Sequence, residues 1–144
     1  MKADLRPGLS RTKRLVIDRD RTIEFMGEEG RVYATPFLVR DIEQTCRDVL
    51  LEHGDANEDS VGMEVCIRHL APTLAGMNVE ITATVTAVDG RKVSFDISAK
   101  DDLEPIASGT HVRFVLDVAK RAERLKAKAA KRAAQAGPIS GLNE

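Results

Sequence analysis

Aromatic residues are scarce in this chain, which has no Trp, one Tyr and four Phe among its 144 residues. A hydrophobic core must therefore consist mostly of aliphatic side chains. Hydrophobic residues still make up 42% of the chain, and that is enough for one domain of this length to bury a core. The composition predicts one globular domain rather than two.

Cysteines are few, and long apolar runs are absent. Cys46 and Cys66 lie in periodic apolar segments, which suits reduced thiols better than a disulfide framework. No apolar run approaches the ~18 residues that a membrane span needs. The first residues, MKADLRPGLSRTKR, are charged and lack the apolar stretch of a signal peptide. We therefore expect a cytoplasmic protein with no membrane association.

The net charge of -1 conceals a basic segment near the C-terminus. Residues 120–136, KRAERLKAKAAKRAAQA, contain seven Lys or Arg and one Glu. Such a segment could bind nucleic acid, but it has no aromatic residue to stack on bases. Ala and Lys also favour helix, so a solvated helix is the preferred interpretation and nucleic acid is an unlikely partner by this prediction. We predict a domain at residues 1–118 and a basic helix and tail at 119–144.

The apolar periodicity predicts an α+β protein with one principal helix. Short strands are expected at 12–20 and 30–35, and the helix follows at once. Thr35 suits the N-cap, Pro36 the first helical position and Gly54 the C-terminal end. The predicted buried stripe consists of Leu38, Ile42, Cys46 and Val49.

Four β-like runs follow, at residues 60–72, 77–90, 91–102 and 104–118. Asp89-Gly90 predicts a hairpin between the second and third runs, and Gly109 predicts a bulge or a close backbone approach. The residues expected on apolar faces are Val61, Met63, Val65, Ile67 and His69; Val79, Ile81, Ala83, Val85 and Ala87; and Val93, Phe95 and Ile97.

One long helix followed by antiparallel strands with one apolar face predicts that the helix covers the sheet. A sheet wrapped around a single helix is the hotdog arrangement. So small a domain leaves sheet edges and part of the helix unprotected, which favours a homodimer or a dimer of dimers.

Three polar residues stand out as candidates for chemistry. Glu43 lies about 100° from the centre of the helix stripe, so it is a solvated flank residue unless a second subunit covers it. His69 ends the apolar row of its strand, where a histidine is either packed or catalytic. Thr35 needs no role beyond capping. Cys66 and His69 have ligand-like spacing but point to opposite faces of a strand, so no metal site is predicted.

The order of several short motifs adds a resemblance. The matching positions are Ala34-Thr35, Glu43, Ser60-Val61-Gly62, His69 and Gly109-Thr110-His111-Val112-Arg113. Over roughly residues 31–118, this order resembles the hotdog thioesterases, most closely the fluoroacetyl-CoA-specific thioesterase-like proteins. The resemblance implies that Thr35, Glu43 and His69 catalyse hydrolysis of an acyl-CoA thioester. It also implies that Gly62, Pro36 and Phe37 contact the substrate, with no cofactor beyond the CoA of that substrate.

The resemblance leaves the details of the reaction open. Glu43 could attack the thioester directly or activate water, while His69 moves the proton and Thr35 orients a reacting group. The segment at 21–32 is shorter than its counterpart in those proteins and has only Phe25 as an aromatic, and Gln44 replaces a Trp. We therefore predict a small or medium acyl group without assigning it. The alternatives are a non-catalytic acyl-CoA-binding hotdog module and a nucleic-acid-associated protein that acts through its basic tail.

Overall fold

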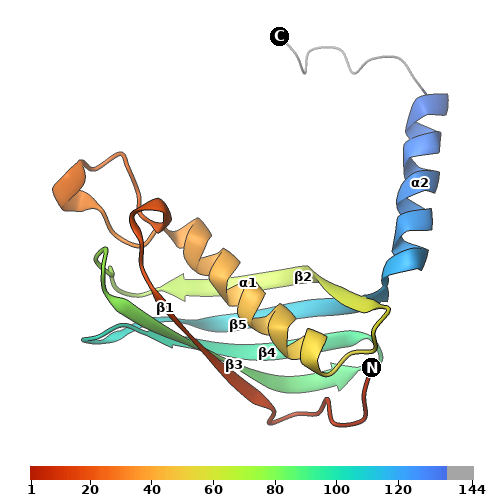
Figure 1. The fold of residues 1–144 in the computed structure, drawn as a ribbon, viewed down its shortest axis with the longest axis horizontal. Coiled ribbons are helices and arrows are strands. Elements are labelled where there is room, and N and C mark those ends of the chain that lie inside the picture. The colour runs from red at the N-terminus through yellow and green to blue at the C-terminus, as the bar shows by residue number, and fades with distance from the viewer. Residues whose placement is uncertain (136–144) are drawn as a thin grey trace.

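One long helix lies across a five-stranded antiparallel sheet in the computed structural model, which describes residues 1–135 (Figure 1). The strand order is β1-β3-β4-β5-β2. The elements are β1 (Ser10–Val16), the 3-10 helices η1 (Arg19–Arg21) and η2 (Glu28–Gly30), α1 (Thr35–Glu52), β2 (Glu58–His69), β3 (Asn78–Asp89), β4 (Lys92–Lys100), β5 (Pro105–Asp117) and α2 (Val118–Ala134). This arrangement confirms the predicted α+β hotdog fold.

The core between α1 and the sheet is almost entirely aliphatic, as the composition predicts. The buried stripe of α1 includes all four predicted residues, and β3 and β4 face it with alternate side chains that are fully buried or nearly so. These residues are Leu38, Ile42, Cys46 and Val49 from α1, Val79, Ile81, Ala83 and Val85 from β3, and Val93, Phe95 and Ile97 from β4. The Asp89-Gly90 hairpin is also confirmed, because Asp89 pairs with Lys92 and Gly90 has φ of 59°.

The start of α1 differs from the prediction. Ala34 occupies the N-cap position, Thr35 is the first helical residue and Pro36 the second. The Thr35 hydroxyl therefore does not cap the helix and is free to bond elsewhere. The strand predicted at 30–35 is also wrong, because this segment forms only isolated bridges, from Val32 to Leu74 and from Tyr33 to Thr22.

Two β-bulges place some residues on a different sheet face from the one predicted. In β2, the register shifts between Gly62 and Glu64, so Gly62 pairs with buried Arg113 and, further on, Val65 pairs with buried His111. An extra residue in a strand moves the following side chains to the opposite face. The prediction that Val61 and Met63 lie on the same face as Val65, Ile67 and His69 is therefore wrong, because the bulge separates the two groups.

The second bulge lies in β3, where the register shifts between Val85 and Ala87. The predicted inward position of Ala87 is wrong for the same reason, and this residue is exposed. The sequence alone does not reveal either extra residue. In both strands, apolar residues continue at every second position through the bulge.

The C-terminal helix α2 extends away from the sheet and helix layers (Figure 1). None of its residues is buried. The boundary predicted between residues 118 and 119 remains a prediction, although α2 begins at Val118, and the tail from residue 136 lies outside the described residues. No helix within residues 1–135 is long and apolar enough to cross a membrane.

Gly109 confirms the predicted close backbone approach, without a bulge at that position. A Cβ at residue 109 would lie 2.0 Å from the backbone oxygen of Cys66, and φ is 157°. We expect Gly109→Ala to lower the free energy of unfolding by about 3–5 kcal/mol, because β2 and β5 would have to separate. Gly76→Ala is the matched control: φ is 90° and an added Cβ would meet no atom within 4 Å, so the variant should lose only about 1–2 kcal/mol from backbone strain. Chemical denaturation of both variants tests this, and equal losses would contradict the steric argument.

Candidate active site

A hydroxyl and an imidazole meet where the start of α1 reaches the end of β2. The Oγ1 atom of Thr35, the first residue of α1, lies 2.8 Å from Nδ1 of His69, the last residue of β2. The other ring nitrogen, Nε2, is buried and has no hydrogen-bond partner among the described residues. Burial lowers the pKa of His69, so the ring is neutral near pH 7. A neutral imidazole with one nitrogen held and the other unpaired is suited to proton transfer.

This pair borders a pocket of about 390 Å³. Its walls are mostly apolar and come from the 21–32 segment and from the residues that follow β2. They include Ile23, Phe25, Val32, Leu70, Ala71 and Pro72. The pocket therefore offers a small apolar group a place directly beside Thr35 and His69.

A network of polar side chains around Asp41 packs against His69 through the Tyr33 ring. The Tyr33 hydroxyl donates to Oδ2 of Asp41 at 2.5 Å, and Nε of Arg21 donates to the same oxygen at 2.9 Å. The Tyr33 ring packs edge-on against His69 with centroids 6.3 Å apart. Burial and the Asp41 hydrogen bond raise the pKa of Tyr33, so its hydroxyl remains a donor. Our sequence analysis missed this network; its only signal is a carboxylate, Asp41, inside the apolar stripe.

Glu43 lies at a second location, farther along α1. An added Cβ at Gly62 would be 2.8 Å from Oε1 of Glu43, so the carboxylate lies directly against the β2 backbone. The same Cβ position would be 3.4 Å from Cε1 of His111 and 3.8 Å from Nη1 of Arg113. A side chain at position 62 would therefore push the Glu43 carboxylate out of this place.

Arg113 and His111 are held rigidly beside that carboxylate. The guanidinium of Arg113 donates to Oγ and to the backbone oxygen of Ser60, both at 2.8 Å, and its Nη1 lies 3.2 Å from Nε2 of His111. His111 Nδ1 donates to the Glu64 carbonyl at 2.8 Å, which leaves Nε2 to accept from Arg113. Burial lowers the pKa of His111, so the positive charge next to Glu43 belongs to Arg113. The sequence marked these residues only as part of a motif.

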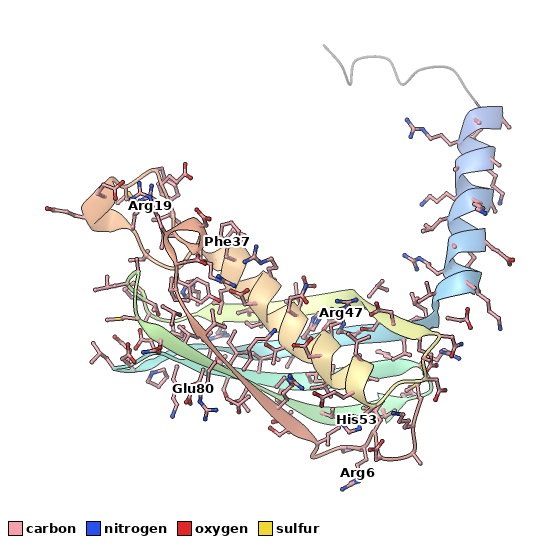
Figure 2. All side chains as sticks on the ribbon, in the orientation of Figure 1. Arg6, Arg19, Phe37, Arg47, His53 and Glu80 are labelled. Atoms are coloured by element: carbon pink, nitrogen blue, oxygen red, sulfur yellow. The ribbon has the colours of Figure 1, made fainter. Side chains whose placement is uncertain are left out.

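One copy of the chain does not bring all the predicted catalytic residues together. Gly62, beside Glu43, and His69 are separated along β2 by about 20 Å at the usual strand rise. Thr35 and Glu43 are eight residues apart on α1, about 12 Å at the helical rise. Figure 2 shows the direction of this helix, with Phe37 near its start and Arg47 farther along it. A single protomer therefore keeps Glu43 apart from the Thr35–His69 pair.

The predicted substrate-binding residues Pro36 and Phe37 lie on the first turn of α1. Pro36 is exposed, and the ring of the partly buried Phe37 lies 4.8 Å below the Arg40 guanidinium. Neither contributes to the walls of the 390 Å³ pocket, so their contact with substrate remains a prediction. Across residues 1–135, no cluster of three or more His, Cys, Asp or Glu side chains is arranged to hold a metal ion.

A sheet wrapped around one helix, with a hydroxyl–imidazole pair at its edge, defines a hotdog protein equipped for acyl chemistry. The profile of the fluoroacetyl-CoA-specific thioesterase family matches residues 17–119. The fluoroacetyl-CoA thioesterase of Streptantibioticus cattleyicolor is 32% identical over 127 residues, covering 83% of this chain and 91% of that protein. The chain therefore belongs to the fluoroacetyl-CoA-specific thioesterase family.

Solved structures agree with this assignment. A crystal structure of a variant of the fluoroacetyl-CoA-specific thioesterase has a TM-score of 0.81 at 30% identity, covering 88% of this chain and 99% of that one. A thioesterase superfamily member from Thermus thermophilus has a TM-score of 0.78 at 28% identity, covering 90% and 99%. A hot-dog-like protein from Thermanaerovibrio acidaminovorans shares the fold, with a TM-score of 0.78 at 23% identity and coverage of 85% and 91%.

Proposed function

We propose that this protein is an acyl-CoA thioesterase for a small or medium acyl group, and that it works in the cytoplasm as a homodimer. The observation that carries the proposal is the Thr35–His69 pair, which lines an apolar pocket in a member of a thioesterase family, while the buried Nε2 has no partner among the described residues. The name of the curated relative supports a CoA thioester as the substrate class. Thr35, Glu43 and His69 are the proposed catalytic residues.

The exposed edge of β2 supports the homodimer. Among residues 1–135 this 12-residue strand pairs with β5 alone, and its apolar side chains Met63 and Val65 are 56% and 44% exposed. A long, unpaired apolar edge favours antiparallel pairing with a second copy. A two-fold axis between Val65 and Cys66 would bring Gly62 opposite His69 of the second copy. Each site would then combine Glu43 from one copy with Thr35 and His69 from the other.

The proposed chemistry needs only side chains at this combined site. The acyl group occupies the pocket beside Thr35, and its thioester carbonyl lies between His69 and Glu43. Glu43 either attacks the carbonyl, which expels the CoA thiolate and leaves an anhydride that water hydrolyses, or removes a proton from the water that attacks the carbonyl. His69 transfers the proton that the departing CoA sulfur takes up. Arg113 offsets the charge that develops near Glu43. No metal or organic cofactor takes part, and CoA is the leaving group.

A thiol-release assay on a panel of acyl-CoA esters, from acetyl and fluoroacetyl to medium chains, tests the function directly. We expect turnover with at least one small or medium acyl group, since the pocket of about 390 Å³ has apolar walls. Tight binding of CoA esters with no release of thiol from any of them would contradict the proposal and favour a non-catalytic binding module.

The lowered pKa of His69 leads to a prediction of pH dependence. Burial depresses this pKa below the usual 6.5, so the neutral ring persists as the pH falls towards that value. We expect kcat/KM to hold its plateau down to about pH 6.5 and to decline only below it, as His69 becomes protonated. A pH profile of kcat/KM on the best substrate checks this. An acid limb with its midpoint above 6.5 would contradict the role of a buried, neutral His69.

A further inference from the structure

A basic pocket of about 260 Å³ lies where α2 leaves the sheet. Its cationic side chains are Arg91, from the start of the β4 hairpin, and Lys120, Arg121 and Arg124, from the first turns of α2. Phe114 and Leu116 supply its apolar wall. Four cations around one apolar-walled hollow form a site suited to an anion that also carries a flat or apolar part.

Most of the positive charge of this pocket is not neutralised by ion pairs within the described residues. Within residues 1–135, Lys120, Arg121 and Arg124 form no ion pair with a carboxylate. Asp117 also lines the pocket, but its carboxylate already accepts from the Lys120 backbone N–H and from the Asn57 amide. Arg91 is anchored, because its Nη1 donates to Oε2 of Glu58 at 3.0 Å.

The position of the pocket relative to Glu43 suggests its ligand. Leu116 pairs with Asp59 while Arg113 pairs with Gly62, so the pocket wall is about 10 Å along the strands from Gly62, which lies beside Glu43. The arm of CoA between sulfur and pyrophosphate is about as long as four or five extended residues, ~15 Å. An acyl-CoA with its thioester at Glu43 can therefore place its phosphates among these cations.

The proposed dimer would leave a route between the two sites at the start of β2. Arg113 faces α1 and the adjacent Phe114 faces the outer side of the sheet, so the CoA arm must cross from one side to the other. In the proposed dimer, residues 58–61 extend past the stretch in which the two β2 strands pair. Opposite them would lie residues 70–73 of the second copy, which follow its strand, so the arm can cross the sheet there.

We infer that Arg91, Lys120, Arg121 and Arg124 form a binding site for the nucleotide phosphates of CoA, with Phe114 available to the adenine ring. This inference rests on the proposed function and deepens it by assigning a role to α2. Arginine binds phosphate through paired, charge-assisted hydrogen bonds, and aromatic rings stack on adenine. The basic helix is then a part of the substrate site rather than a solvated extension.

Two charge-reversal double variants of the full chain test the inference. Arg121→Glu/Arg124→Glu changes the pocket, and Lys126→Glu/Lys131→Glu makes the same change in charge on α2 outside the pocket. We expect the pocket variant to raise KM for an acyl-CoA about tenfold or more, with kcat unchanged, and the control to leave KM within about twofold. The matching acyl-pantetheine thioester lacks the nucleotide, so its kcat/KM should be the same for both variants and the wild type.

Calorimetric titration with CoA separates the failure of this inference from the failure of the proposed function. If the wild type hydrolyses no thioester, the proposed function is wrong, but the Kd for CoA should still rise only in the pocket variant. Equal effects of the two double variants, or no effect of either, would overturn the inference. Salt-sensitive binding of an RNA oligonucleotide that both variants lose equally, with unchanged CoA binding, would also overturn it and indicate a general polyanion-binding helix.

Discussion

Glu43→Gln is expected to reduce kcat/KM for acyl-CoA hydrolysis by about a thousandfold while the protein stays folded. Glutamine keeps the shape of the side chain but can neither attack the thioester nor accept a proton from water. The carboxylate is partly exposed at the β2 edge, so its loss leaves no buried cavity. The thiol-release assay measures the rate, and thermal unfolding verifies the fold.

Glu52→Gln is the matched control for this prediction. Glu52 is an exposed carboxylate at the end of the same helix, where it pairs with Arg11. Its replacement should leave kcat/KM within about twofold of the wild type, since surface ion pairs contribute little. A Glu43→Gln variant that retained more than about a tenth of the activity would exclude Glu43 as nucleophile or base.

His69→Ala is expected to have a comparable effect, with a loss of about a hundredfold to a thousandfold in kcat/KM. The change removes the imidazole that lines the pocket and releases the Thr35 hydroxyl from its only side-chain partner in the described structure. The acid limb of the pH profile should disappear together with the activity, because the titrating group is gone. A purely structural role for His69 would lower stability but preserve that limb.

His53→Ala is the control for this second variant. His53 follows α1 and its Nδ1 lies 3.0 Å from a carboxylate oxygen of Asp4, far along the helix from Thr35. Its removal should change the unfolding temperature without changing kcat/KM. Comparable losses of activity in both histidine variants would indicate that general destabilisation, rather than chemistry, explains the effect of His69→Ala.

The fold was largely predictable because its signals are local. The stripe of Leu38, Ile42, Cys46 and Val49 has helical spacing, and the alternation in β3 and β4 leads directly to the buried faces. The Asp89-Gly90 turn determines where two of the strands meet. The bulges in β2 and β3 were not predictable in this way, since an extra residue is identified by its pairing with another strand.

The candidate site was predictable only in part, because its geometry depends on distant contacts. Thr35 suits an N-cap by sequence, yet Ala34 occupies that position and the hydroxyl bonds to His69, 34 residues away. Nothing in the sequence around Asp41 indicates that Tyr33 and Arg21 donate hydrogen bonds to its carboxylate. The separation of Glu43 from His69 within one copy follows from how α1 packs along β2, with Thr35 beside His69 and Glu43 beside Gly62, and periodicity does not predict that packing.

The site is therefore proposed to form between two copies, and this explains why β2 leaves an apolar edge exposed. Gly62 makes room for the Glu43 carboxylate, and the proposed two-fold axis would place it opposite His69 of the second copy. Dimerisation would then complete the active site as well as cover Met63 and Val65.

The activity of a mixed dimer is the most direct test of whether Glu43 of one copy acts together with His69 of the other. Glu43→Gln and His69→Ala chains, each inactive alone, are co-expressed with different affinity tags, and the thiol-release rate of the mixture is measured. A mixed dimer holds one site with both Glu43 and His69 intact, so random pairing should restore about a quarter of the wild-type activity. A mixture as inactive as its two components would show that the two residues do not act together across a dimer interface.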